Sequence, residues 1–340
     1  MRLTALLLAS LTLYHAGCQT PSASPPDSAA TVQKPTYIGS IERIDGRIGT
    51  YLAGNARIEQ LATGFSWAEG PLWIPDRQML LFSDVPENVV YAWSDTAGVR
   101  VFLKPSGLAR PDPELIREAG ANGLALDGNG RLLLADSGNR ALARFDFETG
   151  RKRLIARRYD GKRLNSPNDV ISTSDSTVYF TDPPYGLAGG LDSPLRELPF
   201  SGVYRYRERQ PLELITSELR FPNGVALSPD EATLYVSNSD PERPIIMAYD
   251  LTAETPAGRL FFDATALREA GGPGLPDGMA VHADGTLFAT GPGGVLVLSP
   301  AGEHLGTIST GGPVANVAFG PDQRMLFMTS DSVLARVRLR

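Results

Sequence analysis

Six acidic or amide side chains recur along the chain, each beside a short apolar segment. They lie 39 to 55 residues apart and are Glu69, Asn122, Asn168, Asn223, Asp277 and Asn316. Carboxylate and amide oxygens are the ligands that hard divalent cations prefer, with Ca²⁺ favoured and Mg²⁺ or Mn²⁺ as alternatives. Zn²⁺ is the least favoured of the possible ions because it prefers Cys and His. Carboxylates that met at one point would repel one another without a cation, so the residue types indicate a metal site if the fold brings them together.

A structural alternative applies to each of these six residues taken alone. Asn and Asp are common where a turn meets a strand, because their side chains bond to the nearby backbone. Only the convergence of several such oxygens on one axis favours a binding site over six separate turns.

A second series of short polar or glycine residues lies 14 or 15 residues after the first. It consists of Asp84, Asp136, Asp182, Asn238, Gly291 and Ser330. The segments between the two series contain turns rich in Asp, Gly, Pro or Asn, such as "LDGNGR" and "LSPDEA", flanked by apolar runs. Each pair therefore reads as a β-hairpin, which returns to the end at which it started and places both series on one rim.

Repeats of about 40 to 50 residues built from short strands are typical of a propeller. We therefore predict an all-β fold, a six-bladed β-propeller over residues 37–340, with the first series facing the channel mouth and the second just outside it. The last blade lacks an outer strand, whereas a spare strand at 57–63 precedes the first blade. The N-terminal strand should therefore close the last blade, which removes two free sheet edges.

The first 36 residues are predicted to lie outside the propeller. Residues 1–17 resemble a signal peptide, and "HAGC" ending at Cys18 resembles a bacterial lipoprotein signal, although His15 departs from its usual apolar residue. Residues 18–36 would form a flexible, Pro-, Ser- and Ala-rich tether. Cys18 is the only cysteine, so we expect a lipid anchor there and a periplasmic, outer-membrane location because Gln19 follows it. The alternative is an ordinary secretory signal with an incidental cysteine.

Five motifs in order resemble the gluconolactonase, regucalcin and senescence-marker-protein family. They are "WAEGPLW" (67–73), "NSPNDV" (165–170), "FTDPPYG" (180–186), "FPNGVALSPDE" (221–231) and "PDGMAVHADG" (276–285). By this resemblance Glu69, Asn223 and Asp277 match metal ligands, and Asn168 matches a residue that binds metal or substrate beside them. Asp277 also matches the proposed proton carrier. Regucalcin has an Arg where this chain has Ser166, so the corresponding sugar-lactone contacts are not expected to carry over.

These assignments predict a metal-dependent hydrolase of a lactone, in particular a sugar lactone. The cation would polarise the carbonyl, and Asp277, or else Glu69, would take a proton from water and return it to the leaving oxygen. The residues expected to orient water or substrate are Asn168, Asn122, Asp182 and Asn316. The alternatives are a phosphotriesterase-like hydrolase on the same metal site and a non-catalytic calcium-binding scaffold of the cell envelope.

Other classes of function find little support in the sequence. The chain contains no Gly-x-Ser-x-Gly motif, which disfavours a serine hydrolase. Its net charge of −6 disfavours a nucleic-acid partner, which would require a basic surface. The expected partner is a small lactone or ester, with membrane contact only through the predicted anchor at Cys18.

Overall fold

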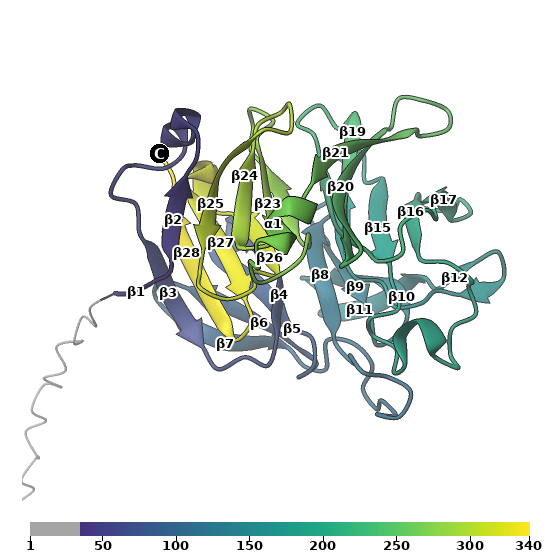
Figure 1. The fold of residues 1–340 in the computed structure, drawn as a ribbon. Coiled ribbons are helices and arrows are strands. Elements are labelled where there is room, and N and C mark those ends of the chain that lie inside the picture. The colour runs from purple at the N-terminus through teal and green to yellow at the C-terminus, as the bar shows by residue number, and fades with distance from the viewer. Residues whose placement is uncertain (1–34) are drawn as a thin grey trace, which may run out of the picture. The chain divides into compact units, whose positions relative to one another are not determined.

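The computed structural model describes residues 35–340, which form six small antiparallel sheets arranged as the blades of a β-propeller (Figure 1). Successive inner strands contact one another around a closed ring, from β4 through β8, β14, β18, β22 and β26 back to β4. The predicted six-bladed, all-β propeller is thus confirmed. The predicted signal peptide and Cys18 lie outside the described residues.

The first three blades each contain four strands, ordered from the channel outward. Blade 1 is β4 (Ala68–Ile74), β5 (Met79–Asp84), β6 (Val89–Ser94) and β7 (Gly98–Leu103). Blade 2 is β8 (Ala121–Leu126), β9 (Leu132–Asp136), β10 (Ala141–Asp146) and β11 (Arg151–Ala156). Blade 3 is β14 (Val170–Ser172), β15 (Val178–Asp182), β16 (Gly202–Tyr206) and β17 (Glu213–Thr216). A small ribbon of β12 (Arg158–Tyr159) and β13 (Lys162–Arg163) connects blades 2 and 3.

Two of the last three blades, blades 5 and 6, include strands from the N-terminal end of the described chain. Blade 4 is β18 (Pro222–Leu227), β19 (Thr233–Asp240), β20 (Arg243–Asp250) and β21 (Gly258–Asp263). Blade 5 is β22 (Met279–Val281), β23 (Leu287–Gly291), β24 (Gly294–Leu298), β25 (His304–Ser309) and β2 (Ser40–Arg43). Blade 6 is β26 (Asn316–Phe319), β27 (Met325–Ser330), β28 (Val333–Arg338), β3 (Ile58–Thr63) and β1 (Thr36–Ile38).

The N-terminal strand closes the ring as predicted. Strand β3 pairs antiparallel with β28, with Thr63 opposite Val333 and Ile58 opposite Val337. Two further strands were not predicted: β1 adds to the outer edge of β3, and β2 adds to β25 in blade 5. They contain only three and four residues, too few for a hydrophobic alternation to stand out in the sequence.

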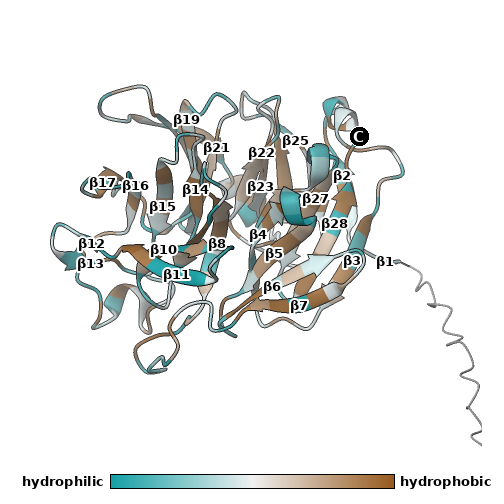
Figure 2. Ribbon diagram, turned by 180° about the vertical axis from the view of Figure 1, so that it is seen from behind, coloured by the Kyte–Doolittle hydropathy of each residue, from teal (hydrophilic) through white to brown (hydrophobic). Residues whose placement is uncertain are grey.

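Hydrophobic residues are concentrated in the strands (Figure 2), and they pack between neighbouring blades. Leu133 and Leu142 of blade 2, for example, belong to one buried cluster with Phe180 and Tyr204 of blade 3. Alternate residues of each strand point to opposite faces of its blade, so both faces can be buried against neighbours. The helical content is small, and within residues 35–340 no helix is long and apolar enough to cross a membrane.

Glycine allows the inner strands to approach one another where the first series of polar residues stands. A Cβ atom on Gly224, which follows Asn223, would lie 2.2 Å from the carbonyl oxygen of Asp277 in the next blade. Such a contact is sterically forbidden, so only glycine permits this spacing. The packing around the channel therefore fixes how far apart the first-series side chains lie.

Candidate active site

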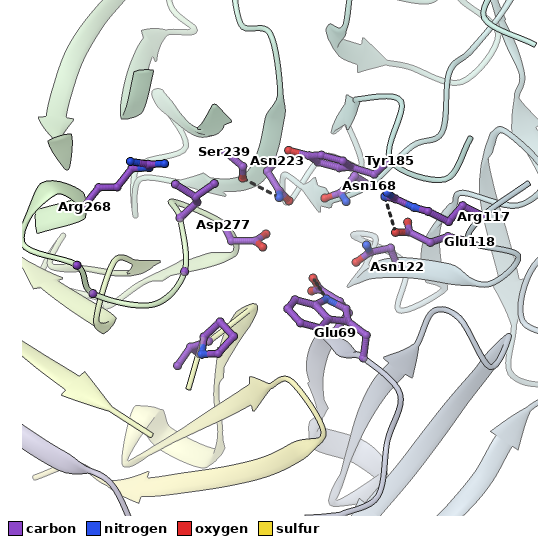
Figure 3. Close-up of a pocket in the computed structure, with 17 residues that line it drawn as sticks. Glu69, Arg117, Glu118, Asn122, Asn168, Tyr185, Asn223, Ser239, Arg268 and Asp277 are labelled. Carbon is purple, nitrogen blue, oxygen red and sulfur yellow. Dashed lines mark hydrogen bonds and ion pairs between the residues drawn. The ribbon is translucent and has the colours of Figure 1, made fainter. Parts of the chain in front are cut away.

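A cavity of about 730 Å³ opens at the end of the channel where the inner strands begin (Figure 3). Five of the six first-series residues line it, namely Glu69, Asn122, Asn168, Asn223 and Asp277. They come from five different blades, and their side chains converge on the centre of the cavity in Figure 3. The repeat thus gathers oxygen donors that are far apart in the sequence.

Glu69 is a buried carboxylate with only neutral hydrogen-bond donors. The indole Nε1 of Trp67 donates to its Oε1 at 3.2 Å, and the backbone N–H of Gly70 donates to its Oε2 at 3.2 Å. Burial, reinforced by the nearby charge of Asp169, raises the pKa of Glu69 to about 8. Its ionised form is therefore disfavoured unless a positive charge is supplied.

Asp277 faces Glu69 across the cavity, and its carboxylate likewise lacks a positively charged partner (Figure 3). Its Oδ1 is buried and has no hydrogen-bond partner among the described residues. Burial, together with the charges of Glu69 and Asp169, raises the pKa of Asp277 well above its usual range. A buried carboxylate oxygen without a partner is costly, so this atom needs a proton or a cation.

Asp169 is a third buried carboxylate, which the sequence analysis did not single out. It occupies the place that Gly70, Gly123 and their counterparts fill in other blades. Its carboxylate accepts hydrogen bonds from the backbone N–H groups of Val170 at 2.9 Å and Val225 at 3.0 Å. Burial raises the pKa of Asp169 to about 6. It therefore braces two inner strands just below the cavity and adds negative potential there.

The amide side chains complete the polar floor of the cavity. Asn223 donates from Nδ2 to the Oγ of Ser239 at 2.9 Å, which leaves its Oδ1 to face the cavity. Among the described residues, no hydrogen bond engages the side-chain amides of Asn122 and Asn168, which project into the cavity (Figure 3). The backbone carbonyl of Asn168 accepts from the N–H of Gly123 at 2.7 Å, which holds neighbouring blades in register.

The structure does not bring Asp182 or Asn316 to this cavity, although both were expected to contact substrate. Asp182 is fully buried, and its Oδ2 accepts from the backbone N–H of Asn165 at 2.8 Å. Asn316 accepts from the N–H of Val317 at 2.8 Å and fills the space left by the missing side chain of Gly278. It faces the opposite end of the channel.

Members of the second series instead hold the loops that lead to the first series. The carboxylate of Asp84 accepts from the backbone N–H groups of Ser66 at 3.0 Å and Trp67 at 3.2 Å, just before Glu69. The Oδ1 of Asn238 accepts from the N–H of Phe221 at 3.0 Å, two residues before Asn223. Asp84 and Asn238 thus position first-series residues but do not themselves line the cavity.

The cavity walls come from residues that carried little or no sequence signal. The indole of Trp67 and the ring of Tyr185 form aromatic walls, and Tyr185 also stacks on Phe221 with ring centroids 5.7 Å apart. Arg117 donates to the Oε1 of Glu118 at 3.1 Å on one side (Figure 3). The other lining residues are Ser239, Arg268, Gly271, Gly272, Gly274, Leu275, Pro313 and Val314.

The donor set at the centre fits a divalent cation held by oxygen atoms. No group of three or more His, Cys, Asp or Glu side chains suited to a metal occurs in residues 35–340, so amides must contribute. The buried carboxylate of Glu69 and the partly buried carboxylate of Asp277 face one point, and no Lys or Arg of the described chain forms an ion pair with either. The unpartnered Oδ1 of Asp277 is an atom that a proton or a cation at this point would satisfy.

The chain is similar to known proteins in both sequence and structure. Residues 67–332 match the SMP-30/Gluconolactonase/LRE-like region. The chain is 42% identical to a gluconolactonase from Zymomonas mobilis over 314 residues, which cover 89% of this chain and 87% of that protein. The structure resembles that of a gluconolactonase from Xanthomonas campestris with a TM-score of 0.78 and 32% identity, covering 90% of this chain and 97% of the other.

A more distant structural neighbour is regucalcin from Agrobacterium tumefaciens, described as a calcium-binding protein. The TM-score is 0.63 at 19% identity, over 82% of this chain and 93% of that one, and this likeness concerns the fold alone. The family match over residues 67–332 and the 42% identity to the Zymomonas mobilis gluconolactonase show that the chain belongs to the SMP-30/gluconolactonase/LRE-like family.

Proposed function

We propose that this protein is a lactonase that acts on sugar lactones and uses a divalent cation, foremost Ca²⁺. The residues proposed to hold the cation are Glu69, Asn168, Asn223 and Asp277. The observation that carries the proposal is the buried, unpartnered Oδ1 of Asp277 opposite the equally buried carboxylate of Glu69. The gluconolactonases among the relatives support the substrate class, and the oxygen donors that line the cavity support a hard divalent ion such as Ca²⁺.

A cation held by Glu69, Asn168, Asn223 and Asp277 would supply a Lewis acid for the lactone carbonyl. Asp277 is the residue that moves the proton. Its carboxylate takes a proton from the attacking water, and it then gives that proton to the ring oxygen as the C–O bond breaks.

Other side chains bind and orient the substrate. Asn122 and Asn168 present amides to the cavity that can bond to water or to sugar hydroxyls. Trp67 holds Glu69 in place through its indole N–H and covers one side of the cavity. Leu275 and Val314 add apolar wall, which limits access of bulk water and strengthens the electrostatic interactions inside.

The test is hydrolysis by the purified protein of a panel that contains D-gluconolactone, an unsubstituted alkyl lactone and a phosphotriester. Acid release is followed by a pH indicator in the presence of Ca²⁺ and after chelation. We expect turnover of the sugar lactone that is lost on chelation and restored by Ca²⁺. Turnover of the phosphotriester alone would favour the phosphotriesterase alternative, and turnover unaffected by chelation would contradict the role of the cation.

We further propose that the mature protein is an envelope lipoprotein anchored through Cys18. This proposal is supported only by the sequence, namely the short apolar run from Leu3 to Tyr14, the single cysteine at 18 and the polar segment after it. The first strand of the propeller begins at Thr36, so residues 18–35 are available as a tether.

A further inference from the structure

The hydroxyl of Ser239 connects two neighbouring blades at the cavity. Its Oγ donates to the backbone carbonyl of Pro276 at 2.5 Å, and it accepts from the Nδ2 of Asn223 at 2.9 Å. Ser239 stands at the end of β19 in blade 4, whereas Pro276 directly precedes Asp277 and blade 5. One hydroxyl therefore contacts the side chain of one proposed cation ligand and the backbone next to another.

The direction of these hydrogen bonds fixes how the Asn223 amide is turned. A carbonyl oxygen can only accept, so the single proton of the Ser239 hydroxyl is committed to Pro276. Toward Asn223 the Oγ can then only accept, which requires the NH₂ end of the amide to face Ser239. The two ends of an amide have almost the same shape, and such networks are what decide between them. The carbonyl oxygen of Asn223 must therefore point into the cavity.

Blade 2 contains half of the same arrangement. Ser137 follows Asp136 as Ser239 follows Asn238, and its Oγ donates to the carbonyl of Pro167 at 2.7 Å, just before Asn168. In the described structure Ser137 forms no hydrogen bond with the side chain of Asn122, the first-series residue of its own blade. Ser137 is thus a matched control, because it makes the same contact between blades but orients no amide.

We propose that Ser239 is a positioning residue that keeps the carbonyl oxygen of Asn223 directed at the cation. This inference rests on the proposed function, since it requires a cation at the centre of the cavity. Without Ser239 the amide would turn freely, and it would present its NH₂ group to the cation for part of the time. The free energy of cation binding would then be less favourable by the cost of orienting the Asn223 amide.

The first experiment is Ca²⁺ titration by calorimetry on the cation-free full-length protein, with thermal unfolding to show that each variant is folded. We expect Ser239→Ala to weaken Ca²⁺ binding about 3- to 10-fold, the range set by the loss of one hydrogen bond. Ser137→Ala should weaken it less than 2-fold, roughly the scatter among such measurements. Equal effects of the two substitutions would overturn the inference, because both would then act only through the contact between blades.

The second experiment places Ser239→Ala in an Asn223→Asp background. A carboxylate has two equivalent oxygens and needs no orientation, so the additional loss caused by Ser239→Ala should shrink to that of Ser137→Ala. An undiminished loss in that background would also overturn the inference. If the unaltered protein binds no Ca²⁺ at all, the proposed function is wrong and this inference falls with it, whereas wild-type binding that Ser239→Ala leaves unchanged contradicts Ser239 alone.

Discussion

Replacing Glu69 by Gln should stabilise the cation-free protein at alkaline pH while it impairs Ca²⁺ binding. The pKa of Glu69 is raised from 4.5 to about 8, mainly because burial disfavours its charge. Between these values the folded protein keeps a proton that the unfolded chain releases. The stabilisation linked to that proton is fully present below pH 4.5 and is lost as the pH rises toward 8. Gln has nearly the same shape as Glu but no charge, so the Glu69→Gln variant should not lose this stabilisation as the pH rises.

The size of the effect follows from one proton retained on folding. Such a difference changes the free energy of unfolding by about 1.4 kcal/mol for each pH unit well between the two pKa values, and by roughly 3 to 4 kcal/mol between pH 5 and pH 8. In a domain of this size 1 kcal/mol shifts the melting temperature by about 2 °C. The variant should therefore gain roughly 6 to 8 °C on the wild type between these pH values. The charge of Glu69 is also one cause of the raised pKa of Asp277, so its removal lessens the pH-dependent loss at Asp277 and acts in the same direction.

The assay is thermal unfolding in a chelator at pH 5, 6, 7 and 8, repeated with excess Ca²⁺. Glu114→Gln, at an exposed position, is the control and should follow the wild type. Ca²⁺ should raise the melting temperature of the wild type at pH 8 and that of Glu69→Gln much less. Parallel pH curves for wild type and Glu69→Gln would refute the reasoning, because Glu69 would then be neither desolvated nor short of a positive partner.

Three further predictions concern catalysis, packing and location. Asp277→Asn should lower kcat for a lactone by about 10²- to 10⁴-fold while calorimetry still detects Ca²⁺ binding, since an amide keeps an oxygen but accepts no proton; near-full turnover with metal bound would exclude Asp277 as the base. Gly224→Ala should lower the free energy of unfolding, measured by chemical denaturation, by about 1 to 3 kcal/mol or prevent folding altogether, because the added Cβ would lie 2.2 Å from the carbonyl oxygen of Asp277. Gly46→Ala, which meets nothing within 4 Å, should leave it nearly unchanged. Cys18→Ser should release the protein from the membrane to the soluble periplasmic fraction, and a wild type already found there would contradict the anchor.

The repeat explains why much of the fold and site could be predicted from the sequence. Residues at the same position of the repeat lie at the same position of their respective blades. Glu69, Asn168 and Asp277 therefore meet, although about 100 residues separate each from the next. The same argument predicted that β3 closes the ring. The last blade lacks an outer strand of its own, and β3 precedes the first blade without belonging to it, so β3 can pair with β28.

A repeat position gives the rim on which a residue stands but not the direction of its side chain. Asp182 turned toward the backbone of Asn165, and Asn316 turned into the space beside Gly278, because local donors and empty volume decided their rotamers. Arg117 and Arg268 reach the cavity from connections between blades that have no common pattern. Such contributions follow from tertiary packing and leave no periodic trace in the sequence.

The pairing of residues 58–63 with 333–338 also sets an order of events during synthesis. The hairpins of the first blades involve neighbours in the sequence and can form as they leave the ribosome, whereas β3 cannot join blade 6 until β28 has been made. The ring thus stays open through almost the whole of translation. Until then the edges of β3 and β28 that later pair stay exposed, which makes this seam the point at which an incomplete chain is most open to wrong strand pairing.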